Sequence, residues 1–125
     1  MSEVIHNTDL IHSSHSPVQD VFDYWYPSTL PWLLESLSKG VAVGAYIAGC
    51  DFISAKDFSG VHFESEYAND VTISFSDLYH YMVLASQRYL DTHPSDKPKV
   101  EKYLTDYRQR FLPEQIKQHP ADPLI

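Results

Sequence analysis

Residues 61–67 alternate between apolar and polar side chains, and the alternation resumes over residues 71–75 after a short polar interruption. A period of two is typical of strands that bury one face and expose the other. The two stretches therefore predict an antiparallel β-hairpin. Asn69 and Asp70 tolerate left-handed backbone angles and bond to their own main chain, so we place the turn there.

Helical periodicity follows directly after the hairpin. Leu78, Met82, Ala85 and Tyr89 recur at the spacing of one buried helical face, Ser76 offers a cap, and Pro94 ends the helix near Asp91. Three more apolar stripes predict three further helices. The first is capped by Ser16 and ended by Pro27, the second runs from Ser28 or Thr29 to about Gly40, and the third runs from Ser95 to Phe111.

The remaining segments carry weaker patterns. Residues 41–48 are nearly all apolar, which fits either a buried strand or a short buried helix. Residues 1–15 and 114–125 are expected to be peripheral, although Val4, Ile5, Leu10 and Ile11 could form an edge strand. The chain is thus predicted to be one α+β domain over residues 1–125, with helices packed on a small antiparallel sheet that contains the central hairpin.

Composition supports a packed, cytoplasmic domain. With 125 residues, 43% of them hydrophobic, the chain is long enough to bury a core without covalent staples. Its single cysteine, Cys50, excludes an internal disulfide and favours a reducing compartment. We recognise neither a signal peptide nor a membrane-spanning run, so we expect no membrane association.

The charge distribution narrows the class of partner. Residues 1–77 carry eleven acids and two lysines, whereas residues 78–125 carry six acids and seven bases, and the whole chain has a formal charge of −8. Nucleic-acid binding needs clustered Lys and Arg, so we expect no nucleic-acid partner. A basic protein partner fits this acidity, and the alternative is that the acidity only keeps the chain soluble.

Catalytic and metal-binding patterns are weak. None of the seven histidines stands at a recognised ligand spacing, and His12 with His15 is interpreted as surface polarity in a loop. His62 falls on the polar side of its strand, where a lone histidine is usually structural or solvated. Cys50 is interpreted as a small buried thiol, and the four glycines form no phosphate-binding loop. We therefore expect no enzyme activity, no cofactor and no metal.

Carboxylates are the best candidates for partner binding. Glu64 and Glu66 share the polar face of the first hairpin strand, Asp70 lies at the predicted turn and Asp57 just before the strand, so together they predict an acidic ridge. The complete set of candidate contacts is Asp51, Asp57, Glu64, Glu66, Asp70 and Asp77.

Four short sequences carry a family resemblance. They are Gly-Cys-Asp-Phe at 49–52, Asp-Phe-Ser-Gly-Val-His-Phe-Glu at 57–64, Asp-Val-Thr-Ile-Ser at 70–74, and Tyr-Leu-Asp-Thr-His-Pro-Ser-Asp-Lys at 89–97. This block, about half of the chain, resembles the immunity proteins of bacterial contact-dependent growth inhibition (CDI) systems, in the subgroup paired with ribonuclease toxins. Phe58, Gly60 and Pro94 would serve the fold.

The resemblance implies a cytoplasmic inhibitor that binds the C-terminal nuclease domain of its cognate toxin, as a 1:1 heterodimer, and blocks it. Such an inhibitor needs no catalytic site, and carboxylates would face the basic cleft of a ribonuclease. Two alternatives stay open: an acidic adaptor or regulatory module with another partner, and a small histidine-dependent hydrolase in which two histidines converge in a pocket.

Overall fold

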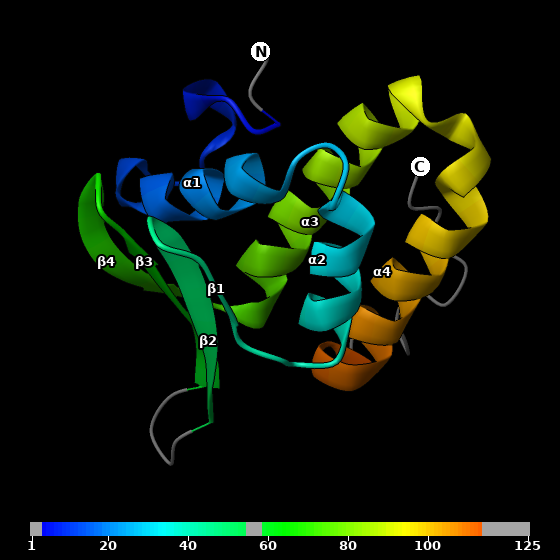
Figure 1. Cartoon of the computed structure of the whole chain (residues 1–125). Helices are drawn as coiled ribbons and strands as arrows, with labels where there is room; N and C mark the ends of the chain where they lie inside the picture. Colours follow the sequence, from blue (N-terminus) through cyan, green and yellow to red (C-terminus); the bar gives the residue numbers. More distant parts are fainter. Residues whose placement is uncertain (1–3, 55–58, 114–125) are drawn as a thin grey trace.

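The computed structural model describes residues 4–54 and 59–113. Across these residues, four α-helices and one four-stranded antiparallel sheet form the predicted α+β fold (Figure 1). The helices are α1 (Ser16–Trp25), α2 (Leu30–Ser38), α3 (Phe75–Thr92) and α4 (Lys97–Phe111), and the 3-10 turns are η1 (Asn7–Asp9), η2 (Ser13–His15) and η3 (Pro94–Asp96). The strands are β1 (Val43–Gly44), β2 (Ala48–Ser54), β3 (Ser59–Ser65) and β4 (Ala68–Ile73).

The sheet is a meander in which the strands pair in chain order, β1 to β4. All four helices lie to one side of it (Figure 1). Inward-facing side chains such as Val61, Phe63 and Ile73 are fully or almost fully buried under the helices. The opposite face of the sheet, which we call the outer face, is covered by no helix of the described residues. Burial on one face only is what the period-two pattern predicts.

The predicted hairpin forms as β3 and β4, but its turn is elsewhere. Glu66 and Tyr67 connect the strands, and Asn69 and Asp70 belong to β4. The pairing register shifts between Phe63 and Ser65, as at a β-bulge, and places Ser65 opposite Ala68. The bulge lets the strands connect through Glu66 and Tyr67, before the turn that we predicted at Asn69 and Asp70.

The predicted helices all form, with small differences at their starts. α3 is capped by Ser74, whose hydroxyl accepts the backbone N–H of Asp77 at 3.0 Å, and not by Ser76. α4 is preceded by η3, so Asp96 takes its cap position and the helix begins at Lys97, after the predicted start at Ser95. The predicted stripe of α3 is buried throughout, and Val100, Leu104 and Tyr107 of α4 are fully buried.

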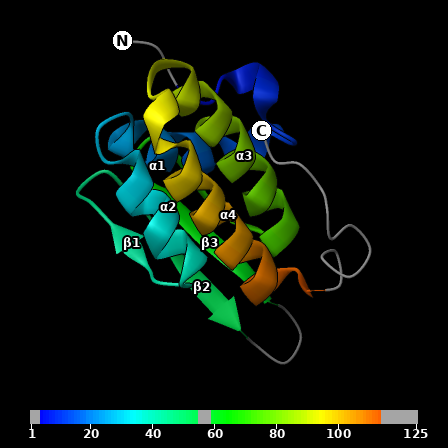
Figure 2. The same cartoon turned by 90° about the vertical axis from the view of Figure 1, so that its right-hand side faces the viewer.

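Helices α2 and α4 lie side by side, on the far side of the molecule from the outer face (Figure 2). Gly40 ends the α2 segment with a φ of +71°, and the Phe111 ring lies 3.0 Å from where a Cβ at this position would stand. Phe111 in turn packs on Phe75 and Phe52, at ring-centroid distances of 4.7 and 5.2 Å. These aromatic contacts hold α4, α3 and β2 together.

Two segments differ from the sequence-based expectations. Residues 41–48 are neither one buried strand nor a helix, since they make the short strand β1 and a tight turn in which Tyr46 is 91% exposed. The segment before η1 is less peripheral than predicted, because Val4 and Ile5 are 1% and 0% exposed. The backbone N–H of Val4 donates to Asp23, and Arg88 donates to the Val4 carbonyl. Residues 4–11 form no strand.

Candidate functional site

The outer face gathers most of the candidate carboxylates. In the β2–β3 register Asp51 lies directly across from His62, and in the β3–β4 register His62 lies across from Thr72. Cross-strand partners point to the same side of a sheet, so these three side chains share the outer face. Glu64 and Asp70 flank the His62 imidazole, with a carboxylate oxygen of each 3.9 and 3.3 Å from Nε2.

A broad, open concavity of about 410 Å³ lies along this face. Its lining comes from the β1–β2 turn on one side and from β2, β3, the β3–β4 turn and β4 on the other. The polar residues of the second side are Asp51, His62, Glu64, Ser65, Glu66 and Asp70, of which Ser65 donates its hydroxyl to Asp20 of α1. Four of the six predicted contact residues therefore meet at one concavity, and whether they contact a partner stays a prediction.

Two predicted contact residues stand apart. Asp57 lies outside the described residues. Asp77 lies in the first turn of α3, where it is half-buried and its charge acts on His15 and Tyr81. It does not line the concavity.

Two exposed tyrosines lie in the turns at one end of the outer face, and the sequence analysis did not single them out; Tyr46 lines the concavity and Tyr67 does not. Tyr46 is at the tip of the β1–β2 turn and Tyr67 in the β3–β4 turn, with 91% and 70% of their surface exposed. The backbone N–H of Glu66 donates to the Ile47 carbonyl at 2.9 Å, which ties the two turns together. Exposed tyrosines beside carboxylates are common in protein interfaces, because the ring supplies apolar area and the hydroxyl a hydrogen bond.

The carboxylates of the concavity are not neutralised by neighbouring cations. Within residues 4–54 and 59–113, no lysine or arginine forms an ion pair with Asp51, Glu64, Glu66 or Asp70. The side chains of Glu64 and Asp70 are 69% and 56% exposed. The outer face therefore presents concentrated negative charge to solvent.

The sequence analysis did not predict which residues form hydrogen bonds with His62 and His15. His62 Nδ1 lies 2.9 Å from the Thr72 hydroxyl, so this histidine is held in place from the neighbouring strand. His15, which we interpreted as surface polarity, is only 8% exposed, and its Nδ1 lies 2.8 Å from the Tyr81 hydroxyl. Burial lowers the pKa of His15 below its ordinary 6.5, although the charge of Asp77 opposes the shift.

The geometry offers little for a hydrolase. Cys50 is buried as expected, and burial raises the pKa of its thiol to about 12, so a reactive thiolate does not form near neutral pH. The His12 and His15 rings approach to 6.2 Å, but His12 Nδ1 accepts the backbone N–H of Ser14 at 3.1 Å as the cap of η2. His15 is engaged with Tyr81. This pair of histidines is accounted for by local structure.

A family model described as CDI immunity protein matches residues 15–104. The chain belongs to this family. The match spans α1 to the middle of α4 and so includes the whole sheet and its outer face. CDI immunity proteins bind cognate toxins, which agrees with the predicted class of function. No curated protein and no solved structure matches the chain. Among the described residues, none of the helices combines the length and apolarity that crossing a bilayer requires.

Proposed function

We propose that this CDI immunity protein neutralises a ribonuclease toxin by binding the toxin's C-terminal domain, 1:1 in the cytoplasm, with the outer face of its sheet. The observation that carries the proposal is the set of carboxylates without cation partners on the face that no described helix covers. A ribonuclease must bind a polyanion, so its active cleft is basic. An acidic face that covers such a cleft gains a fast association and excludes the RNA.

The exposed tyrosines complete the proposed interface. Interface energy usually concentrates in a few aromatic and arginine side chains, and charge at the rim mainly sets the rate of association. We assign the first role to Tyr46 and Tyr67, and the second to the surrounding carboxylates. The acidic face would suit an acidic adaptor equally well, and the family match is what favours an immunity protein; for the hydrolase alternative, His62 is the one histidine that lines the concavity among the described residues.

The direct experiment mixes the purified chain with the C-terminal domain of the toxin encoded beside it. The proposal expects that this domain cleaves RNA, that cleavage stops at one equivalent of immunity protein, and that a 1:1 complex elutes from size exclusion. A domain that degrades DNA or permeabilises membranes, while still bound by this chain, would reject the ribonuclease class and leave the family assignment intact.

The dependence of the association rate on salt tests whether the carboxylates attract the toxin electrostatically. Raising ionic strength from about 50 to 500 mM shortens the Debye length from roughly 14 to 4 Å. The association rate constant should fall steeply over this range, whereas dissociation, governed by the buried aromatic contacts, should change much less. An association rate that does not respond to salt would contradict the role assigned to the carboxylates.

A further inference from the structure

We propose that His62, Glu64 and Asp70 form a binding site for a divalent transition-metal ion of the zinc class. One ligand atom from each residue can be chosen so that all three lie within 4.8 Å of one another. The His62 Nε2 atom is 3.3 Å from Asp70 Oδ2 and 3.9 Å from Glu64 Oε1. The three side chains come from two adjacent strands, β3 and β4, so the backbone fixes their spacing.

These separations suit a small metal ion. Zinc bonds to nitrogen and carboxylate oxygen are about 2.0–2.2 Å long, so two ligands of a tetrahedral site stand roughly 3.4 Å apart. The imidazole and Asp70 already meet this spacing. Glu64 is 69% exposed, so its long side chain has room to move closer to His62 and Asp70 by rotating. The concavity in front of the three residues leaves space for a water molecule or Asp51 as a fourth ligand.

The histidine is oriented by a residue outside the three ligands. Thr72 lies across from His62 on β4, with its hydroxyl 2.9 Å from Nδ1. A hydroxyl can donate or accept, so Thr72 supports either neutral form of the imidazole. When Nε2–H donates to Asp70, Thr72 donates to Nδ1; when Nδ1–H donates to Thr72, the Nε2 lone pair is free for an ion. Metal-binding histidines usually hold their second ring nitrogen in this way.

The ligand chemistry selects the class of ion. An imidazole nitrogen favours zinc and its neighbours over magnesium and calcium, which prefer oxygen ligands throughout. The charges agree as well, because a 2+ ion would balance Glu64 and Asp70, which no lysine or arginine of the described residues neutralises, and would leave Asp51 and Glu66 as the acidic side chains of the outer face. The inference does not rest on the proposed toxin interface, since the ion would bind the free protein.

The experiment titrates the free, full-length chain with ZnCl2 alone, by calorimetry. The wild-type protein is expected to bind one ion at this site. His62→Gln should weaken binding by more than about 100-fold, and Thr72→Val, which removes only the orienting hydroxyl, by about tenfold. Matched controls are Glu66→Gln, a neighbouring carboxylate outside the trio, and His80→Gln, an exposed histidine on α3. Both should retain wild-type affinity.

A second readout identifies the ligand atom. Long-range ¹H–¹⁵N spectra of the imidazoles should show the His62 Nε2 resonance shifting first and saturating at one equivalent of zinc. Far-ultraviolet circular dichroism of each variant checks that it is folded. The proposal is overturned if wild-type protein binds no zinc at millimolar concentration, if His62→Gln retains full affinity, or if another histidine shifts while His62 does not. Each of these results would leave the proposed toxin binding untouched.

Discussion

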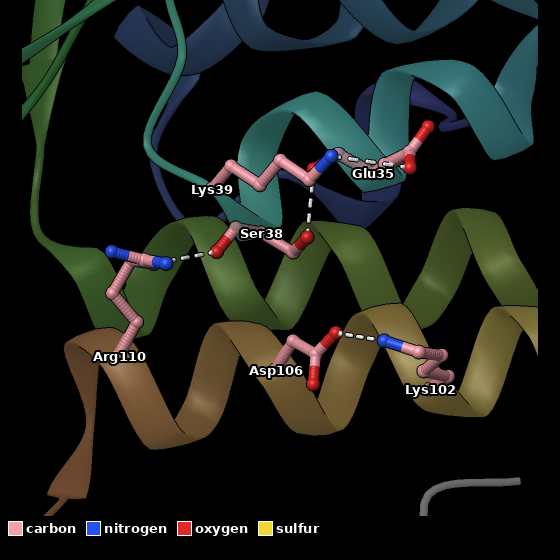
Figure 3. Close-up of polar contacts among 6 residues, drawn as sticks. All are labelled: Glu35, Ser38, Lys39, Lys102, Asp106 and Arg110. Carbon is pink, nitrogen blue, oxygen red and sulfur yellow. Dashed lines mark hydrogen bonds and ion pairs between the residues drawn. The ribbon is translucent and has the colours of Figure 1, made fainter.

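The outer face of the sheet and the opposite surface, along α2 and α4, carry charge in different ways. On α2 and α4 several charged side chains have partners: Lys39 lies 3.3 Å from Glu35, Lys102 lies 2.8 Å from Asp106, and Arg110 donates to the Ser38 carbonyl at 3.0 Å (Figure 3). On the outer face the carboxylates stand beside one histidine and no described lysine or arginine. Both surfaces are hollowed, by about 410 Å³ on the outer face and by about 370 Å³ beside Lys39, Asp106 and Arg110, so the partners of the charges and not the presence of a concavity separate the two regions.

This difference indicates which surface of the domain is the better candidate for partner binding. Paired surface charges contribute little to stability and have no strong preference for a charged partner. Concentrated charge of one sign weakens the fold slightly through self-repulsion, so its presence is better explained by binding. These charges support the proposal that the outer face, and not the α2–α4 surface, binds the partner.

The largest loss of stability is expected from a mutation that creates a cavity in the α2–α4 region. Leu104 of α4 is fully buried, so Leu104→Ala should lower the unfolding free energy by about 2–5 kcal/mol. Urea denaturation measures the loss, and protection against toxin should fail only as far as the protein unfolds. A variant that stays as stable as the wild type would show that this surface does not hold the core.

Removing an aromatic side chain from the outer face should act on binding alone. Tyr46→Ala truncates an almost fully exposed ring, so the melting temperature should stay unchanged. Toxin affinity should drop by about tenfold or more, as expected for an aromatic side chain that carries interface energy. The matched control is Tyr24→Ala on α1, a half-exposed ring away from the concavity. Equal losses from both variants would erase the distinction between the regions.

A third prediction concerns pH and the buried His15. Because burial lowers its folded-state pKa, the unfolded chain binds the proton more readily just below pH 6.5. Stability should therefore be complete above about pH 6.5 and decline as the pH falls through the depressed folded pKa. Denaturation curves between pH 7.5 and 5 measure this slope, and His15→Gln should flatten it. A slope that is the same in wild type and variant would exclude His15 as its source.

The smallest effect is expected at a paired surface charge. Asp106→Ala breaks the exposed Lys102–Asp106 pair on α4, and the melting temperature should hardly change because solvent screens an exposed pair. Protection against toxin should be unaffected. A clear loss of protection by this folded variant would move part of the interface to the helical surface.

The helices could be predicted because their signals are local. Stripes such as Leu78, Met82 and Ala85 need only the helical period, and Pro17 and Pro31 mark helix starts through their own fixed backbone angle. Turns and caps were placed less well. Ser74 and Ser76 are equally good capping residues by type, and only the path of the chain out of β4 decides between them.

The candidate site was predictable only in part. Alternation alone places His62 and Glu64 on one face, but Asp51 joins them through the β2–β3 register and Asp70 through the bulged β3–β4 register. Register depends on contacts between strands, which a single sequence does not display. Tyr46 was missed for a related reason, since a run of apolar residues predicts burial unless the tight turn within it is known.

The central claim is tested most directly by reversing charge on the outer face in one variant and on the helices in another. Glu64→Lys with Glu66→Lys, on the outer face, and Asp91→Lys with Glu101→Lys, on α3 and α4, each reduce the net charge from −8 to about −4. Toxin affinity and growth protection are measured for both folded variants. The account predicts that the first loses protection and the second keeps it. Protection by the first variant at an unchanged melting temperature would contradict the outer face as the binding surface.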